Sequence, residues 1–257
     1  MQIAPRAFRV SALAIGLFAW ALTSQFALAQ KEGANEETSS PNATSPRTKK
    51  SPVPLKVYKG RHVAQTMHFS GAEWLMRESR EGEERCSLML ANLGVKPGSI
   101  ICDMGCGNGF HTIQLAKMVG PQGHVYAVDI QPEMLKMLNN RMDREGITNV
   151  TPVLGSFMNP RLPRGKIDLI LCVDVYHEFG FPEQMLAGMR DSLSPDGAVV
   201  LVEFRAEDDN VPIKPEHKMT KDQIMLELPA NGYKLVKEYD KLPWQHMMWF
   251  GRDDSRP

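Results

Sequence analysis

A buried strand that runs into a glycine-rich turn constrains this chain more than any other feature. The apolar run at 100–102 leads to Asp103, and glycine then recurs at every second position. These glycines are Gly105, Gly107 and Gly109. Glycine allows left-handed φ angles and lets a ligand come close to the main chain. A second apolar run at 124–129 ends in Asp129. The segment therefore predicts a strand-turn-helix-strand unit that binds a ligand where its first strand ends.

The spacing of these residues argues against a dinucleotide. The Gly-x-Gly-x-x-Gly pattern of dinucleotide sites would require glycine at the position of Phe110. The Asp103 carboxylate would repel a pyrophosphate, but it would attract a ligand that carries an ammonium and a sulfonium. Asp129 stands 20 residues after Gly109, where a carboxylate can accept hydrogen bonds from both hydroxyls of a ribose. Each residue alone also fits an ordinary turn or a solvated acid, but together they favour a nucleoside with a cationic tail.

Beyond this unit, short apolar runs alternate with amphipathic stretches, which is typical of a parallel α/β sheet. The predicted strands are 99–104, 124–129, 150–154, 167–175, 198–204, 233–239 and 247–251. The predicted helices are 111–119, 132–145, 182–193, one opened by a Thr220/Gln223 capping box, and 71–93 in two pieces around Gly82. Pro152 interrupts the third strand, so we expect that strand at an edge of the sheet. Residues 194–197 read as a turn.

Two further motifs complete a resemblance. Asp168-Leu-Ile-Leu-Cys-Val-Asp174-Val-Tyr-His-Glu178 forms the fourth strand and its end, and Leu193-Ser-Pro-Asp-Gly197 precedes the fifth strand. With the glycine loop, they make residues 99–251, about three-fifths of the chain, resemble class I S-adenosylmethionine-dependent methyltransferases. The segment looks most like the small-molecule branch that includes ubiquinone/menaquinone C-methyltransferases and other "methyltransferase type 11" domains. The resemblance implies a single α/β domain, Rossmann-like and doubly wound, with a mostly parallel seven-stranded sheet.

The resemblance also implies an enzyme whose cofactor is S-adenosyl-L-methionine. In that family the glycine loop holds the methionine part of the cofactor, and the acid that matches Asp129 holds the ribose. Ser156 replaces an Asp that often bonds the adenine amino group, and a hydroxyl can accept that bond too. The expected cofactor-binding residues are Asp103, Gly105, Gly107, Gly109, Asp129, Ile130, Ser156 and Asp174.

Methyl transfer from a sulfonium mainly requires alignment of the reactants, exclusion of water and, for a protic acceptor, removal of a proton. The polar residues after the fourth strand lie where α/β folds place substrate. We predict His177 as the general base, with Tyr176 beside it, because the unperturbed pKa of histidine suits neutral pH. A histidine that only packs on the sheet is the equal alternative. No metal site is predicted.

Several acceptor classes can be argued against. Lys and Arg together number 30, as do Asp and Glu, so the chain lacks the net basic charge of a nucleic-acid binder. The fourth strand lacks the two prolines of enzymes that methylate amino groups of nucleic acids. A small organic acceptor, of lipophilic character, remains. Two other functions stay open: an exported, non-catalytic protein of this fold, and an NAD(P)-dependent oxidoreductase, which Phe110 and Asp103 disfavour.

The N-terminus predicts export. Arg6 and Arg9 precede an apolar run at 10–22, and the small residues Ala27 and Ala29 offer a cleavage site. We expect an exported or periplasmic protein, or one held at the membrane by the uncleaved segment. The expected organisation is a signal peptide at 1–29, a disordered linker at 30–54, an N-terminal helical cap at 55–94 and the methyltransferase domain at 95–257. The four cysteines are predicted to be buried free thiols.

Overall fold

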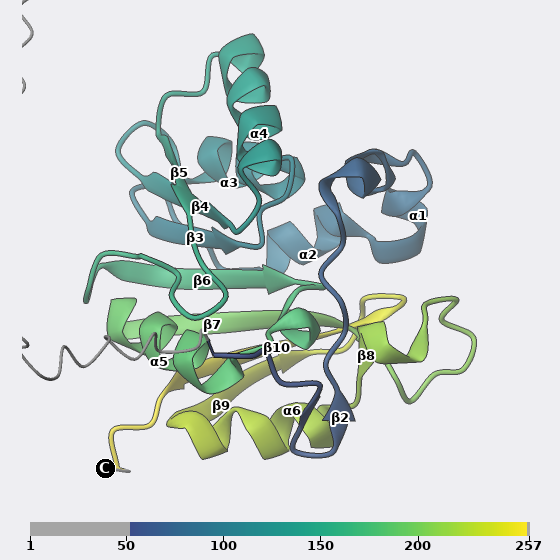
Figure 1. Ribbon diagram of the computed structural model, residues 1–257. Helices are drawn as coiled ribbons and strands as arrows, with labels where there is room; N and C mark the ends of the chain where they lie inside the picture. Colours follow the sequence, from purple (N-terminus) through teal and green to yellow (C-terminus); the bar gives the residue numbers. More distant parts are fainter. Residues whose placement is uncertain (1–51, 256–257) are drawn as a thin grey trace, which may run out of the picture. The chain divides into compact units, whose positions relative to one another are not determined.

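A mixed sheet of eight strands lies at the centre of residues 52–255, the part of the chain that the computed structural model describes (Figure 1). Along the sheet the order is β5-β4-β3-β6-β7-β10-β9, and the short β8 pairs with β7. The strands are β3 (Ile100–Met104), β4 (His124–Asp129), β5 (Val150–Leu154), β6 (Ile167–Val173), β7 (Leu193–Arg205), β8 (Lys218–Met219), β9 (Tyr233–Tyr239) and β10 (Gln245–Arg252). β10 runs antiparallel to both of its neighbours, and the other pairs are parallel.

The predicted α/β fold is confirmed, with its seven strands on one continuous path and β8 beside it. β5 lies at the edge of the sheet, as Pro152 indicated. The turn predicted at 194–197 is wrong, because this segment is the first part of β7. Leu193 already pairs with Ile167 as the chain leaves the preceding helix, and a register shift before Leu169 accommodates the additional residues.

Helices cover both faces of the sheet, so the domain is doubly wound (Figure 1). They are α2 (Cys86–Asn92), α3 (Phe110–Val119), α4 (Pro132–Glu145), α5 (Pro182–Ser192) and α6 (Lys221–Glu227). Successive residues of a strand point to opposite faces. Accordingly Ile101 packs in the core with α2, α3 and α4, whereas Cys102 packs in the core with α5 and α6. The predicted cap of α6 is present, since Thr220 Oγ1 accepts a hydrogen bond from the Gln223 nitrogen at 3.0 Å.

The segment before the sheet is less regular than predicted. It contains a hairpin of β1 (Val57–Tyr58) and β2 (Arg61–His62), the 3₁₀ helix η1 (Phe69–Met76) and α1 (Arg80–Glu84). Gly82 lies inside α1, and the chain breaks instead at Arg85, whose φ of 51° is left-handed. A buried ion pair of Arg80 with Glu84, at 2.8 Å, holds α1 together across the glycine.

All four cysteines are buried free thiols, as predicted. Among residues 52–255, no helix is long and apolar enough to cross a membrane. The predicted signal peptide and residues 30–51 of the predicted linker lie outside the described residues.

Candidate cofactor and substrate site

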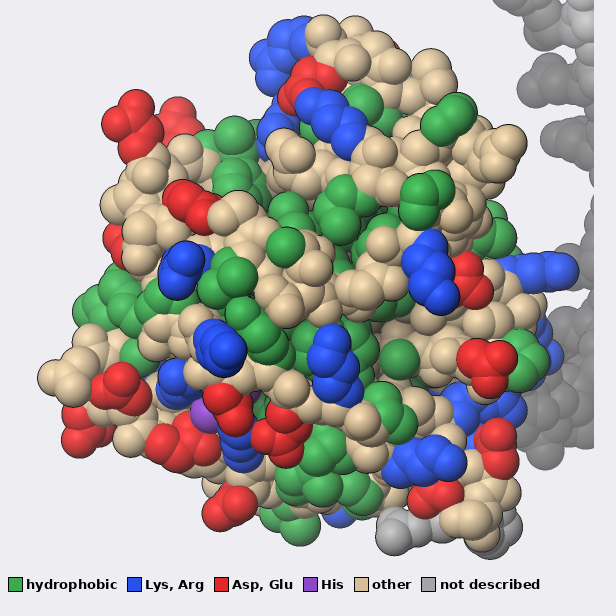
Figure 2. All heavy atoms as spheres, turned by 180° about the vertical axis from the view of Figure 1, so that it is seen from behind, with side chains coloured by type: hydrophobic (Ala, Val, Ile, Leu, Met, Phe, Trp, Pro, Cys, Tyr) green, Lys and Arg blue, Asp and Glu red, His purple; other side chains and the backbone are tan. Residues whose placement is uncertain are grey.

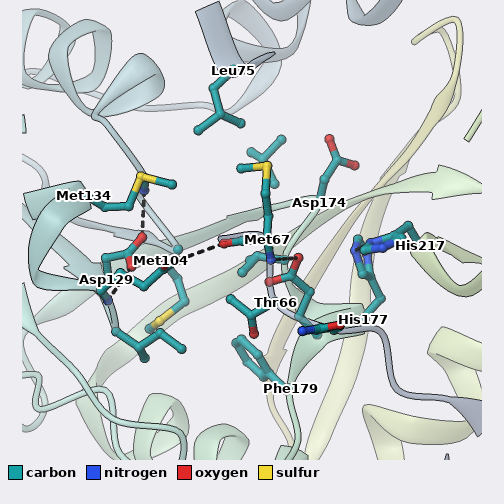
Figure 3. A pocket seen from close by; sticks show the side chains of 18 of the residues that line it. Thr66, Met67, Leu75, Met104, Asp129, Met134, Asp174, His177, Phe179 and His217 are labelled. Atoms are coloured by element: carbon teal, nitrogen blue, oxygen red, sulfur yellow. Dashed lines mark hydrogen bonds between the residues drawn. The ribbon is translucent and has the colours of Figure 1, made fainter. Parts of the chain in front are cut away.

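A cavity of about 780 Å³ opens at the carboxyl ends of β3, β4 and β6 (Figure 3). This volume lies within the range of roughly 300–1,000 Å³ that is typical of ligand pockets. The strand order reverses between β3 and β6, because β4 and β5 extend to one side of β3 and β7 to the far side of β6. Open α/β sheets bind their ligands at such a reversal. Residues 65–68, Trp74 and Leu75 of the N-terminal segment line the cavity from outside the sheet.

The glycine loop after β3 forms one wall of this cavity. Gly105 and Gly107 line it with φ angles of +69° and +53°. A Cβ on Gly107 would lie 2.8 Å from Leu75 Cδ1, on the covering segment, and a Cβ on Gly105 would overlap Val175. Gly109, by contrast, lies against Leu138 of α4 and is not among the lining residues. The first two glycines therefore leave room for a ligand, whereas the third lets two helices approach.

Asp129, at the end of β4, lines the cavity and also holds the glycine loop in place. Its Oδ2 accepts a hydrogen bond from the Gly107 nitrogen at 2.9 Å, and its Oδ1 accepts one from the Gln131 nitrogen at 2.8 Å. Burial raises the pKa of Asp129, although these backbone N–H groups favour its charged form. Each carboxylate oxygen keeps a second lone pair, so Asp129 can also accept hydrogen bonds from two ligand hydroxyls.

Asp103 does not line the cavity, although its position at the strand end suggested that it would. The side chain is buried between β3 and α3, where its Oδ2 accepts a hydrogen bond from Thr112 Oγ1 at 2.5 Å. Burial raises the pKa of Asp103 to about 6, and Asp129 adds to the rise. Thr112 lies in the first turn of α3 and offers a donor that the strand pattern does not reveal. The structure thus places this carboxylate beneath the loop rather than against a ligand.

The other predicted cofactor residues lie together on the cavity wall. Ile130 follows Asp129 directly, and Ser156 follows β5. The Ser156 hydroxyl accepts a hydrogen bond from the Asn159 nitrogen at 3.1 Å. Met134 of α4 and the half-exposed Phe157 add apolar surface beside them. No periodicity in the sequence distinguishes a methionine of α4 that faces a ligand from one in the core.

Asp174, just after β6, carries a buried oxygen without a partner. Its Oδ2 accepts a hydrogen bond from Gln245 Nε2 at 2.7 Å, whereas its Oδ1 has no hydrogen-bond partner among the described residues. Burial raises the pKa of Asp174 well above its ordinary value, and Glu84 and Glu203 raise it further. A buried oxygen on a cavity wall that still lacks a donor fits a ligand that supplies one.

His177 is buried at the cavity wall opposite Asp129 (Figure 3), with both ring nitrogens engaged. Its Nδ1 donates to Glu203 Oε2 at 2.5 Å, and its Nε2 lies 3.1 Å from His217 Nδ1. Burial lowers the pKa of His177, but the Glu203 carboxylate outweighs it and leaves the pKa raised. Glu178 also lines the cavity, and burial raises its pKa to about 7. His217 was not predicted as a site residue, because it lies in an irregular segment, 40 residues from His177 in the chain.

Tyr176 lies outside the cavity, unlike its neighbour His177. Its ring is fully buried, and its hydroxyl donates to Glu227 Oε2 at 2.7 Å. Glu227, on α6, also forms an ion pair with Arg61 of β2 at 2.7 Å. The tyrosine therefore belongs to a buried network that ties the N-terminal hairpin to the domain.

Part of the N-terminal segment covers the cavity. His68 and Trp74 line it, and the Arg77 guanidinium stacks on the Trp74 ring at 3.7 Å from its centroid. Gln131 secures the segment, since its side chain accepts a hydrogen bond from the Phe69 nitrogen at 2.8 Å and donates one to the Met67 carbonyl at 2.9 Å.

Comparisons with known proteins show the family of the chain. Residues 95–250 match the family model described as a methyltransferase domain. The ubiquinone/menaquinone biosynthesis C-methyltransferase UbiE of Cupriavidus taiwanensis is 34% identical over 116 residues, which are 45% of this chain and 47% of that protein. A protein-L-isoaspartate O-methyltransferase of Methanothrix thermoacetophila is 35% identical over 69 residues, 27% of this chain and 33% of that protein. The chain thus spans about half or less of the length of these relatives.

A solved structure shows the same fold. The SAM-dependent methyltransferase from Aquifex aeolicus superposes with a TM-score of 0.68 at 24% identity, over 72% of this chain and 98% of that one. The cavity fits S-adenosylmethionine through its glycine wall, the Asp129 carboxylate and the unpartnered Asp174 oxygen. The chain therefore belongs to the methyltransferase-domain family, its domain is of the class I type, and S-adenosylmethionine is its cofactor.

Proposed function

We propose that this chain transfers a methyl group from S-adenosylmethionine to a small organic acceptor inside the cavity. The observation that carries this proposal is the shared space of about 780 Å³. One wall of this cavity carries the glycine loop, in which the Gly107 nitrogen donates a hydrogen bond to Asp129. The opposite wall carries the polar side chains of His177 and Glu178. A donor bound at the first side would direct its reactive end toward the second.

The residues that would hold the cofactor follow from the cavity wall. Gly105 and Gly107 would leave space for the methionine part, and Asp129 with Ile130 would bind the ribose. Ser156, also on the cavity wall, would accept a hydrogen bond from the adenine amino group. When bound, the cofactor supplies a methyl group on a sulfonium; the acceptor nucleophile would bond to the methyl carbon in line with the breaking C–S bond, and the neutral thioether would leave.

The chain itself orients the acceptor and excludes water. Apolar side chains of Phe179, Met185, Phe204 and Ile213 line the half of the cavity near His177. They would bury the carbon skeleton of a lipophilic acceptor and leave its reactive atom near the polar groups. Residues 65–68, Trp74 and Leu75 cover the outer side, and the exclusion of water there would strengthen electrostatic interactions within the cavity.

His177 is our proposed base for a protic acceptor. Its Nδ1 bond to Glu203 would hold the ring and stabilise the protonated form, as carboxylates do for catalytic histidines. To accept a proton, Nε2 would exchange its contact with His217 for one with the acceptor.

Nucleic acid is a poor acceptor on this surface. On the face drawn in Figure 2, acidic and basic side chains alternate, with no continuous basic stripe. A phosphate backbone binds through concentrated positive charge, which this face does not offer.

The proposal is tested by binding and then by turnover. Calorimetric titration of the purified chain with S-adenosylmethionine, its demethylated product and NAD should give binding of the first two only. A screen of metabolite extract with methyl-labelled donor should then yield a labelled small molecule, and an Asp129→Ala variant should abolish that label. Binding of NAD, or of none of the three, would contradict the proposal. Label found only in macromolecules would contradict its small-molecule part.

A further inference from the structure

Two histidines and a carboxylate converge on one point of the cavity wall. Nitrogen atoms of His177 and His217 and a carboxylate oxygen of Glu178 all lie within 4.8 Å of one another. They come from different places in the chain: the first two residues follow β6 in the 3₁₀ helix η2 (Tyr176–Glu178), and His217 ends the 3₁₀ helix η3 (Pro215–His217). Figure 3 shows the two imidazoles side by side, facing the same space.

The hydrogen bond to Glu203 fixes the tautomer of neutral His177. A carboxylate accepts a hydrogen bond, so Nδ1 carries the proton and the lone pair of the neutral ring lies on Nε2. That lone pair faces His217 Nδ1 at 3.1 Å. A carboxylate behind a histidine whose other nitrogen faces outward is the arrangement that orients metal-bound histidines.

The spacing of the two nitrogens suits a shared ion. Zinc binds imidazole nitrogen at about 2.0–2.1 Å, so nitrogens 3.1 Å apart would subtend roughly 95° at one ion, near tetrahedral and octahedral angles. The ring planes are nearly perpendicular, at 88°, which keeps the two rings from clashing. Glu178 Oε1 accepts a hydrogen bond from the Met67 nitrogen at 3.3 Å, and its second oxygen remains for an ion.

The charges of the cluster also suit a divalent cation. Glu178 and Glu203 together supply two carboxylates; Glu203 is fully buried and Glu178 partly buried. Two imidazoles and one carboxylate are the ligand set of catalytic zinc sites, which keep one position open. Cavity space lies beside all three residues, so the open position would face the acceptor half of the cavity.

We propose that His177 Nε2, Glu178 and His217 Nδ1 bind one divalent transition-metal ion of the zinc class, with Glu203 as the positioning residue behind His177. The role of this ion rests on the proposed methyl transfer. An acceptor hydroxyl or thiol that binds at the open position would lose its proton more easily, since the ion stabilises the resulting anion. In that state the ion, rather than His177, activates the acceptor.

Cobalt(II) is the probe for this site, because its visible absorption reports coordination by nitrogen ligands. The whole chain, purified without a histidine tag and stripped with a chelator, is titrated with Co²⁺ and then with Zn²⁺. We expect one Co²⁺ per chain and its displacement by Zn²⁺. His217→Ala removes a ligand whose side chain is partly exposed, so it leaves no cavity in the core. It should weaken Co²⁺ binding by more than about tenfold, because tenfold is already the lower end of the loss when a residue that only positions a ligand is mutated. Glu203→Gln should weaken it by about 10–100-fold.

His124→Ala is the matched control, because His124 is a partly exposed histidine that bonds Thr151 and lies outside the cluster. It should bind Co²⁺ as the wild type does. S-adenosylmethionine titration checks that each variant is folded and separates the two proposals, since Asp129, the residue proposed to bind the ribose, lies across the cavity from His217 (Figure 3). Equal Co²⁺ binding by wild type and His217→Ala, or no binding by either, would overturn the metal site. A bound ion without methyl transfer would instead count against the proposed function.

Discussion

The carboxylate of Asp129 accepts a hydrogen bond at 2.9 Å from the backbone nitrogen of Gly107, 22 residues earlier in the chain. The residue expected to hold a ribose therefore also fixes the shape of the loop expected to hold the methionine part. Because one carboxylate does both, the two halves of the cofactor site form a single unit. Substitutions on either side of this bond should consequently affect binding and loop geometry together.

The first prediction concerns Gly107 itself. A Gly107→Val side chain would occupy the cavity at φ +53° and meet Leu75 Cδ1, so S-adenosylmethionine binding should disappear. Gly146→Val is the matched control: its φ is +65°, and nothing lies within 4 Å of an added Cβ. Both variants carry the backbone strain, but only the first fills the cavity. Calorimetry should show lost binding for Gly107→Val alone, and equal affinities would refute the site.

The second prediction concerns Asp129. Asp129→Ala removes the acceptor for two ligand hydroxyls, and should weaken S-adenosylmethionine binding by on the order of 2–3 kcal/mol. Asp129→Asn keeps the shape, but its side-chain NH2, a donor, would face the backbone N–H of Gly107 or Gln131. We therefore expect the Asn variant to lose affinity as well, and to unfold at a lower temperature than wild type.

Asp168→Asn provides the control for Asp129. Asp168 also accepts a hydrogen bond from a backbone nitrogen, that of Ile100 at 2.9 Å, but it lies outside the cavity. It should affect stability without changing the affinity for the cofactor. Unchanged affinity in both Asp129 variants would mean that this carboxylate does not contact the ligand.

Hydrophobic patterning predicted the strands well because parallel strands are buried on both faces. The strand predicted at 167–175 is β6, which ends two residues earlier at Val173, and the strand predicted at 99–104 is β3, which begins one residue later at Ile100. Patterning says little about where one side chain points at the end of a strand. Asp103 is the last but one residue of β3 and Asp129 the last of β4, yet the first bonds a helix and the second faces the cavity. The difference depends on Thr112, a partner that no periodicity singles out.

Hydrophobic patterning also missed contacts between residues that are distant in the chain and lie in irregular segments. His217 and the covering residues 65–68 lie on the cavity wall, but they belong to loops and 3₁₀ turns without a repeating pattern. His177 and His217 are 40 residues apart in the chain, and they meet because the loop after β7 returns to the same end of the sheet. Such contacts depend on the packing of the whole domain, and one sequence does not encode them locally.

The third prediction concerns pH and Asp103. Burial raises its pKa in the folded state to about 6, above the usual value near 3.8. The folded protein therefore binds this proton more tightly than the unfolded chain, so the stability that Asp103 contributes is present below pH 3.8 and is lost as pH rises toward 6. Between pH 5 and 7 this amounts to about 1 kcal/mol of unfolding free energy. Urea denaturation of wild type and Asp103→Asn should show it.

Asp103→Asn cannot ionise, so its stability relative to wild type should improve by that amount from pH 5 to pH 7. Other titrating groups are common to both proteins and cancel in the difference. A constant difference across this range would contradict the raised pKa of Asp103.

The fourth prediction concerns residues 1–54, of which only 52–54 are described by the structure. We propose that 1–29 act as a signal peptide, so mass spectrometry of the protein from its native cells should find an N-terminus at Gln30 in the exported fraction. S-adenosylmethionine is made in the cytosol, so an exported enzyme would require a supply of this cofactor outside the cytosol. An intact Met1 in membranes would indicate an anchor, and an intact Met1 in the cytosol would contradict export.

The last prediction separates structure from chemistry at Tyr176. Its hydroxyl donates to the buried Glu227, so Tyr176→Phe leaves a buried carboxylate oxygen with one donor fewer. We expect the free energy of unfolding to fall by about 1–3 kcal/mol and the affinity for S-adenosylmethionine to stay unchanged. Tyr233→Phe is the matched control, because that buried hydroxyl donates to the Leu186 carbonyl at 2.7 Å, far from the cavity. Urea denaturation and calorimetry on both variants should give the same pattern. If Tyr176→Phe slowed methyl transfer at saturating cofactor and Tyr233→Phe did not, the result would support the predicted catalytic role of Tyr176. It would contradict a purely structural role.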